Sequence, residues 1–273
     1  EIRPRDWSSD VCSSDLLTPL ERPDNVQGRE FLTDDEYKQL QGQAARPAAA
    51  NPNNPFPNLF NMDARWVMTN KRTSMITDPK DGKLPPLTPE AKQYVESVRN
   101  SRGKFFANPE ELSSFVRCLP VSTSGPPMLP SAYNNNYQIV QTPDYVAIAT
   151  EMMHDVRIIP MDGRPHAGIQ QWTGDSIGRW DGDTLVVETT GMNDKSWIDR
   201  LGHPHSEQLK VTEKFKKTTA DNMQIDVTLE DPKAYKEPFT VQFNMQLKPN
   251  WEIAEQNCID NSNLDTLEPG VKK

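Results

Sequence analysis

From residue 137 onward the chain alternates apolar and polar residues, and this alternation constrains the fold more than any other feature of the sequence. The clearest example is the run 238–248, where one face carries Phe239, Val241, Phe243, Met245 and Leu247. Successive side chains of a strand point to opposite faces. The run therefore predicts a strand with one buried and one solvated face, as in an antiparallel sheet.

Seven further runs share this period of two: 137–142, 145–152, 155–161, 175–180, 183–190, 207–217 and 223–230. No helical pattern interrupts them, so the eight runs predict an antiparallel up-and-down meander. A sheet of this width is expected to curl, because long exposed edges invite aggregation. We therefore predict a mainly β fold, a calycin-like barrel or a strongly curved sheet. Asp181-Gly182 predicts a tight hairpin within it.

The N-terminal part, residues 17–136, is rich in loops and predicts two to three short helices. Thr33 and Glu36 form a capping box that begins a helix ending near Gln43. Thr88 followed by Pro89 begins a second helix, and 108–118 repeats the pattern. We expect these helices to pack on the β meander of residues 137–260 within one domain, with 261–273 as a flexible tail.

Composition excludes two classes of partner. The chain has 273 residues and a net charge of -9, without clusters of basic residues. Binding to nucleic acid depends on Lys and Arg against phosphate, so we expect no nucleic-acid partner. No apolar run approaches the roughly 18 residues that a membrane span needs. A small-molecule ligand is the partner that we expect.

The connections between the predicted strands place a candidate site at one end of the sheet. Successive connections of a meander alternate between two ends. The long connections 162–174, 191–206 and 231–237 share one end, and the short turns 153–154, 181–182 and 218–222 share the other. Long loops on a rigid scaffold are the usual place for function. The residues at this end that we expect to contact a ligand are Arg164, His166, Trp172, Trp197 and Tyr235.

The histidines at the long-loop end allow three interpretations. His166, His203 and His205 have ring nitrogens that suit a divalent transition metal, with Glu207 or Asp199 completing the ligands. Alternatively, His205 is a general base oriented by Glu207 or Asp199. The third interpretation is structural, with loop histidines hydrogen-bonded to the backbone. Arg164, in the turn Asp162-Gly163-Arg164-Pro165, is either a turn residue or a clamp for a carboxylate or phosphate.

Known sequence signatures of catalysis and cofactor binding are missing from the chain. There is no G-x-S-x-G nucleophile motif, and Ser206 beside His205 is weak evidence for a nucleophile. No dinucleotide-binding, P-loop or EF-hand pattern is present either. The sequence therefore points to no cofactor beyond the metal interpretation above.

Residues 6–16, DWSSDVCSSDL, resemble the conceptual translation of a short-read sequencing adapter. We therefore exclude residues 1–16 from the fold expectation, as either adapter-derived or disordered. Two cysteines then remain, Cys118 and Cys258. They either form one disulfide, which favours an oxidising compartment, or remain two unpaired buried thiols. We favour the disulfide.

Five blocks of the chain match a known family in order: RTSMITDPKDGKLPPLTPEA (72–91), IVQTPDYVAI (139–148), DGRPH (162–166), GRWDGDTLVVETTGM (178–192) and HPHSEQLKVTEKF (203–215). On these blocks the chain resembles a large family of exported proteins, abundant in acidobacteria and other soil bacteria, over about Leu17 to Asp260. The resemblance implies export by a signal peptide and a periplasmic or secreted location. It draws attention to His205 and Glu207 but implies no activity.

Three functions from different classes follow from these observations. The first is an exported protein that binds a small organic ligand at the long-loop end. The second is a hydrolase or lyase acting on a small molecule or glycan through His205 with Glu207 or Asp199, with or without a metal. The third is a structural envelope protein without a pocket. A histidine that converges with a partner in one pocket would favour the enzyme.

Overall fold

The computed structural model describes residues 10–14, 18–44, 70–101, 119, 125–130, 135–199 and 202–254. Its α-helices are α1 (Asp34–Ala44) and α2 (Pro89–Ser101), and its short 3-10 helices are η1 (Asp24–Val26) and η3 (Met152–His154). The strands are β1 (Asp10–Ser14), β2 (Ile76–Asp78), β3 (Asn136–Gln141), β4 (Tyr145–Thr150), β5 (Val156–Pro160), β6 (Asp175–Asp181), β7 (Thr184–Thr190), β8 (Lys210–Lys217), β9 (Asn222–Glu230) and β10 (Phe239–Leu247). The fold is therefore mainly β.

The alternation correctly predicts β3 to β10, each within about three residues of its expected bounds. In β10, the side chains of Phe239, Val241, Phe243 and Met245 are buried, and those between them are only partly buried. β9 shows the same alternation beside it. These buried faces form one continuous core, so local sequence pattern and tertiary packing agree along the sheet.

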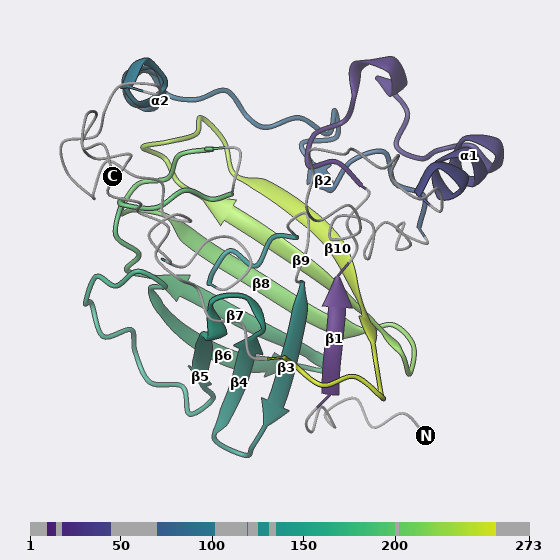
Figure 1. Cartoon of the computed structure of the whole chain (residues 1–273). Coiled ribbons are helices and arrows are strands. Elements are labelled where there is room, and N and C mark those ends of the chain that lie inside the picture. The colour runs from purple at the N-terminus through teal and green to yellow at the C-terminus, as the bar shows by residue number, and fades with distance from the viewer. Residues whose placement is uncertain are drawn as a thin grey trace, which may run out of the picture.

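The strands form one antiparallel sheet. The order of neighbours is β5-β4-β3-β1-β10-β9-β8-β7-β6, and β2 pairs with β10 beside this path. In Figure 1, β1, β3, β4 and β5 lie in front of β6 to β10, so the sheet folds back over itself. The two α-helices lie at the top of the same view, α2 on the left and α1 on the right.

The strand β1 differs from the expectation that residues 1–16 take no part in the fold. It pairs with β3 on one side, Cys12 opposite Tyr137, and with β10 on the other, Cys12 opposite Leu247. Strand addition of this kind depends on backbone hydrogen bonds and accepts many sequences. The side chains of this segment therefore do not predict the backbone pairing of β1.

The strands that the structure describes do not close into a barrel. The path of paired strands ends at β5 on one side and β6 on the other. Side chains join these two strands instead, because Arg157 of β5 donates from Nε to Ser176 Oγ of β6 at 2.9 Å. Its Nη2 reaches Thr189 Oγ1 of β7 at 2.8 Å. The strongly curved sheet is thus the observed alternative.

A buried ion pair lies behind this junction. Arg157 Nη2 is 2.6 Å from Glu213 Oε2 of β8, and the two side chains are 4% and 0% exposed. Glu213 also accepts a hydrogen bond from the Met128 backbone N–H at 3.0 Å. Two charges taken out of water depend on each other, so this pair connects three segments that are distant in sequence.

Both predicted helices that fall in the described residues are confirmed. α1 has the expected capping box, with the Thr33 N–H donating to Glu36 Oε2 at 2.9 Å and the Glu36 N–H donating to Thr33 Oγ1 at 3.3 Å. The predicted helix at 108–118 and the tail 261–273 lie outside the described residues. None of the helices described has the length and apolar character to cross a membrane.

The predicted hairpin between β6 and β7 is present, but its loop is shifted by one residue. Asp181 pairs with Thr184, so the two loop residues are Gly182 and Asp183 and not Asp181 and Gly182. Gly182 has φ +62°, a conformation that glycine adopts without a steric penalty. Glycine at the first loop position is typical of one of the two favoured hairpin turns.

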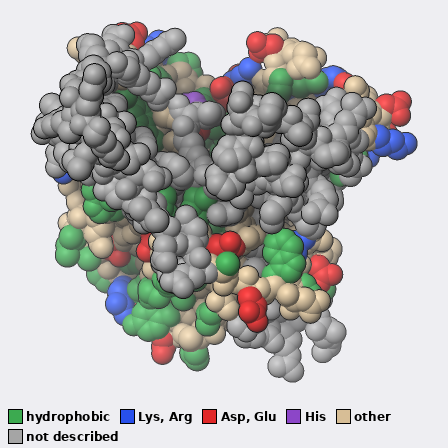
Figure 2. Space-filling model, viewed as in Figure 1, with side chains coloured by type: hydrophobic (Ala, Val, Ile, Leu, Met, Phe, Trp, Pro, Cys, Tyr) green, Lys and Arg blue, Asp and Glu red, His purple; other side chains and the backbone are tan. Residues whose placement is uncertain are grey.

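One outer surface of the sheet is apolar. Its exposed members are Val140 of β3, Tyr145 of β4, and Val156 and Ile158 of β5, the last two about half exposed. Figure 2 shows hydrophobic side chains gathered over the lower part of the molecule, where β4 and β5 lie in Figure 1. None of these four residues lines the hollow around His205 that is described below.

Candidate functional site

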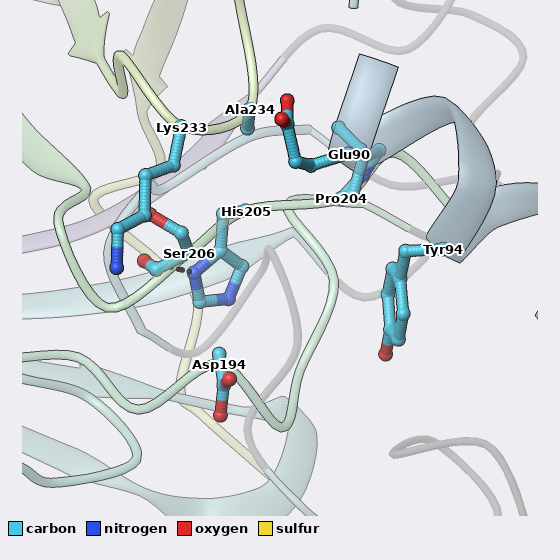
Figure 3. A pocket seen from close by; sticks show the side chains of 9 residues that line it. Glu90, Tyr94, Asp194, Pro204, His205, Ser206, Lys233 and Ala234 are labelled. Atoms are coloured by element: carbon cyan, nitrogen blue, oxygen red, sulfur yellow. Dashed lines mark hydrogen bonds between the residues drawn. The ribbon is translucent and has the colours of Figure 1, made fainter. Parts of the chain in front are cut away.

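A hollow of about 200 Å³ lies at the long-loop end of the sheet. Its wall comes from three segments: α2, the β7–β8 connection and the β9–β10 connection. The residues that line it are Glu90, Ala91, Tyr94, Asp194, Pro204, His205, Ser206, Lys233 and Ala234. Figure 3 shows the His205 ring in the middle of this group, with Tyr94 to one side and Asp194 below. Two of the three long connections predicted to share one end therefore form one site.

The start of α2 fixes this helix against the β9–β10 connection. Thr88 caps the helix by accepting the Ala91 N–H at 3.2 Å. Thr88 also donates its hydroxyl to the Lys233 carbonyl at 2.5 Å and its N–H to the Ala234 carbonyl at 3.0 Å. The capping residue that begins the helix thus also holds one wall of the hollow in place.

Asp231 joins the two long connections. Its buried carboxylate accepts hydrogen bonds from the Ser206 N–H at 2.6 Å and the Ser206 hydroxyl at 2.7 Å. It also accepts the N–H groups of Lys233 and Ala234, both at 3.1 Å. Tyr235 adds a link by donating its hydroxyl to the Pro204 carbonyl at 3.0 Å. These bonds position His205 relative to both loops.

His205 is buried, with 7% of its surface exposed. Its Nε2 lies 2.9 Å from Ser196 Oγ, and its Nδ1 lies 3.2 Å from the Ser206 carbonyl oxygen. Burial lowers the pKa of His205 below its usual value, against the smaller opposing effects of the Ser206 carbonyl and of the Asp231 and Asp194 charges. The ring is therefore neutral near pH 7 and has one nitrogen free to accept a proton.

The surroundings of His203 raise its pKa, whereas those of His205 lower it. Its Nδ1 is 2.6 Å from Asp199 Oδ2, and Asp199 Oδ1 also accepts the His203 N–H at 3.2 Å. Burial opposes protonation of the ring, but the hydrogen bond to Asp199 and the charges of Asp199 and Glu21 outweigh it and raise the pKa of His203. Asp199 thus holds the loop through His203 and does not orient His205.

The two rings are expected to titrate on opposite sides of the usual histidine pKa of about 6.5. Because the pKa of His205 is lowered on folding, its contribution to stability is complete above that pH and is lost as the pH falls through the lowered value. His203 contributes fully below about pH 6.5, and its contribution is lost as the pH rises through the raised value. NMR titration of the ring nitrogens, assigned with His203→Gln and His205→Gln, measures both. A His205 ring that titrates above His203 would contradict the geometry.

Glu207 also lies away from His205. Its carboxylate pairs with Lys233 Nζ at 2.9 Å and accepts a longer hydrogen bond from Gln170 at 3.5 Å. The hydrogen bond to Lys233 lowers the pKa of this carboxyl. The expected pairing of His205 with Glu207 or Asp199 is therefore not the one in the structure, where two serines take that place.

The expected metal site is not formed. Within the described residues, no three side chains of the His, Cys, Asp and Glu types come together to hold a metal ion. His166 lines a second hollow of about 220 Å³ together with Arg164, Arg179 and Glu188, and its Nδ1 is 3.4 Å from Asp175. The three histidines have separate partners: His166 lies near Asp175, His203 bonds to Asp199 and His205 contacts Ser196.

Among the expected ligand-binding residues, Arg164 acts as part of its turn. Its guanidinium donates to both carboxylate oxygens of Asp162, at 2.6 to 3.0 Å, and lies over the Tyr145 ring. The hydrogen bond from Arg164 lowers the pKa of Asp162 to about 2. This exposed pair fixes the turn at the mouth of the second hollow.

The three aromatic residues expected at the site have different positions. Trp197 stacks on Tyr94 with ring centroids 5.5 Å apart, so it supports a wall of the first hollow. Tyr235 is 2% exposed and packs edge-on against Phe239. Trp172 is partly buried on the β5–β6 connection and lines neither of these two hollows.

Comparisons with family models, curated proteins and solved structures found no match. Export and the family resemblance therefore stay predictions. The expected Cys118–Cys258 disulfide also stays a prediction, because both cysteines lie outside the described residues.

Ser196, Asp231 and Tyr94 belong to the site but were not predicted from the sequence. Ser196 lies nine residues before His205 in the same long connection, in the stretch Asn193-Asp194-Lys195-Ser196. Its sequence signal is a hydroxyl in the same loop that carries the histidine. For Asp231, the sequence signal is the Asp-Pro pair that follows β9, since this pair often forms a turn. The carboxylate of such an Asp is available to accept hydrogen bonds from backbone N–H groups.

Proposed function

We propose that this protein is exported and binds a small, neutral, partly apolar organic ligand in the hollow around His205. The observation that carries this proposal is the convergence of α2 and two long connections on one hollow at one end of a rigid sheet. Sites of this kind are mostly apolar with a few placed polar groups. A calycin-like arrangement, with ligand entry at the end of a curved meander, is part of the same proposal.

The size and charge of the hollow support a specific class of ligand. Its volume of about 200 Å³ is below the roughly 300 to 1,000 Å³ of sites for drug-sized molecules, so a single ring is the right scale. Glu90 and Asp194 line the wall, while the charge of Lys233 is paired with Glu207. Carboxylates repel anions and accept hydrogen bonds from hydroxyl or amide donors, so an anionic ligand is disfavoured and a neutral ligand with such donors is compatible with the site.

Binding of acetanilide, a neutral single-ring amide, tests this function. The Tyr94→Ala variant is expected to bind about tenfold more weakly, or about 1.4 kcal/mol, because it loses an aromatic wall and the stacking on Trp197. Tyr145→Ala is the matched control, since Tyr145 has a similar exposed fraction, 39% against 43%, on the outer surface of the sheet. Titration by ligand-observed NMR measures both. Equal binding to the two variants would refute the location.

A second function, hydrolysis, is favoured by one observation. Ser196 Oγ lies 2.9 Å from the accepting nitrogen of a buried neutral histidine. This is the relation between a nucleophile and its general base.

A further inference from the structure

The protonation state of His205 follows from its two hydrogen bonds. A carbonyl oxygen only accepts, so the Ser206 carbonyl at 3.2 Å requires that His205 Nδ1 carry the proton. In the neutral ring Nε2 then carries the lone pair. The contact at 2.9 Å is consequently the Ser196 hydroxyl donating to Nε2. This is the direction of proton transfer that turns a serine into a nucleophile.

The surroundings of His205 allow its ring both to accept the serine proton and to release it again. Burial, at 7% exposure, keeps the resting ring neutral. The negative charges of Asp231 and Asp194 act on the ring in the opposite sense and favour the imidazolium. They would therefore stabilise the charged ring while it holds the serine proton, as a carboxylate does in a serine–histidine–aspartate triad.

The serine lies next to a residue that lines the hollow, because Ser196 Oγ is 2.9 Å from Nε2 of His205. Ser196 is only partly buried, and it stands between Asp194, which lines the hollow, and Trp197, which stacks on the lining residue Tyr94. An acyl group of a bound molecule therefore needs only a short reach to its hydroxyl. Ser196 and His205 lie in the same connection, so a structural loop contact would also bring them together. Reactivity of the serine distinguishes a catalytic pair from a structural contact.

We propose that Ser196 is the nucleophile and His205 the general base of an ester hydrolase that acts on small neutral esters held in this hollow. The proposal rests on the proposed binding function of the same hollow. Its substrates would be esters of a small acyl group with a single-ring alcohol, such as an acetylated sugar or a phenyl ester. Glu90 and Asp194 disfavour anionic substrates.

The reaction proceeds in two balanced steps. Ser196 Oγ attacks the ester carbonyl carbon as its proton passes to His205 Nε2, and the bond from that carbon to the alcohol oxygen breaks as Nε2 protonates the leaving alcohol. Water then attacks the acyl-serine, gives its proton to Nε2 and releases the carboxylic acid, while the proton returns to Ser196 Oγ. Ester and water become acid and alcohol, without an oxidant or a metal.

The test uses the full chain and two probes, a fluorophosphonate and phenyl acetate. We expect intact mass and peptide mapping to find one phosphonyl group on Ser196. Ser196→Ala should lose this label and lower phenyl acetate hydrolysis by about 10³-fold or more. His205→Gln should slow both labelling and hydrolysis by about 10²- to 10⁴-fold. Ser97→Ala, an exposed serine of α2, serves as the matched control and should match the wild type.

Acetanilide binding separates this proposal from the function on which it rests. If acetanilide binds the hollow but the folded wild type neither takes the label nor hydrolyses phenyl acetate, the hydrolase proposal is overturned and the binding function stands. A label on another residue, or hydrolysis that survives in Ser196→Ala, also overturns it. Ser196→Ala that still binds acetanilide while hydrolysis is lost supports both. If neither binding nor labelling occurs, both fail.

Discussion

Replacing Glu213 with alanine is expected to lower the free energy of unfolding by about 3 to 5 kcal/mol. The change removes the charge that faces the buried Arg157 guanidinium at 2.6 Å. It also takes the hydrogen-bond acceptor from the buried Met128 N–H. An unpaired charge in the interior costs far more than a lost surface contact. Urea unfolding followed by tryptophan fluorescence measures the loss.

Two controls identify the cause of this loss. Lys210 lies on the same strand β8 and pairs with Glu188 at the surface at 3.3 Å, so Lys210→Ala should cost less than about 1 kcal/mol. The double variant Arg157→Met with Glu213→Leu removes both charges and should recover most of the stability. A double variant as unstable as Glu213→Ala alone would mean that packing and the lost hydrogen bonds to Ser176, Thr189 and Met128, and not the unpaired charge, decide the effect.

Replacing Asp231 with alanine is expected to cost about 3 kcal/mol of stability and to abolish acetanilide binding. This carboxylate accepts four hydrogen bonds that hold the β7–β8 and β9–β10 connections together. Without it, the partly buried Ser206 N–H loses its acceptor, and the Ala234 N–H keeps only the Asp231 backbone carbonyl at 3.1 Å. The wall of the hollow is then no longer fixed. Urea unfolding and the NMR titration measure the two effects.

Asp231→Asn provides the comparison for this prediction. The amide keeps one acceptor oxygen, so it should retain part of the binding and lose less stability than the alanine variant. Intact acetanilide binding in Asp231→Ala would show that the hollow does not depend on this link between the loops.

The strands were predictable because their signal is local. In β10 every second side chain meets the core, so the sequence of that strand alone specifies which face is buried. The hairpin loop was misplaced by one residue, since Gly182 fits either loop position of a tight turn. The role of β1 was not predictable, because its pairing with β3 and β10 uses backbone groups that every sequence has.

The place of the site was predictable, but its hydrogen bonds were not. Counting connections brought His205 and the 231–237 loop to the same end, as the hollow confirms. The partners of His205 depend on how the 191–209 connection turns back, where the Ile198 N–H donates to the His203 carbonyl at 2.9 Å. That turn gives Asp199 to His203 and leaves Ser196 facing His205. No spacing rule in the sequence describes such a path.

The position of β10 has a consequence for how the chain folds as it is synthesised. This strand, residues 239–247, pairs with β9 on one edge and with β1 and β2 on the other. The hairpins from β6 to β9 join neighbours in sequence and can form early, whereas contacts between distant segments form slowly. A chain still lacking β10 presents the bare edge of β9, which invites pairing with other chains. Nascent chains therefore carry an aggregation risk until β10 emerges, and slowing synthesis just before residue 239 should increase it.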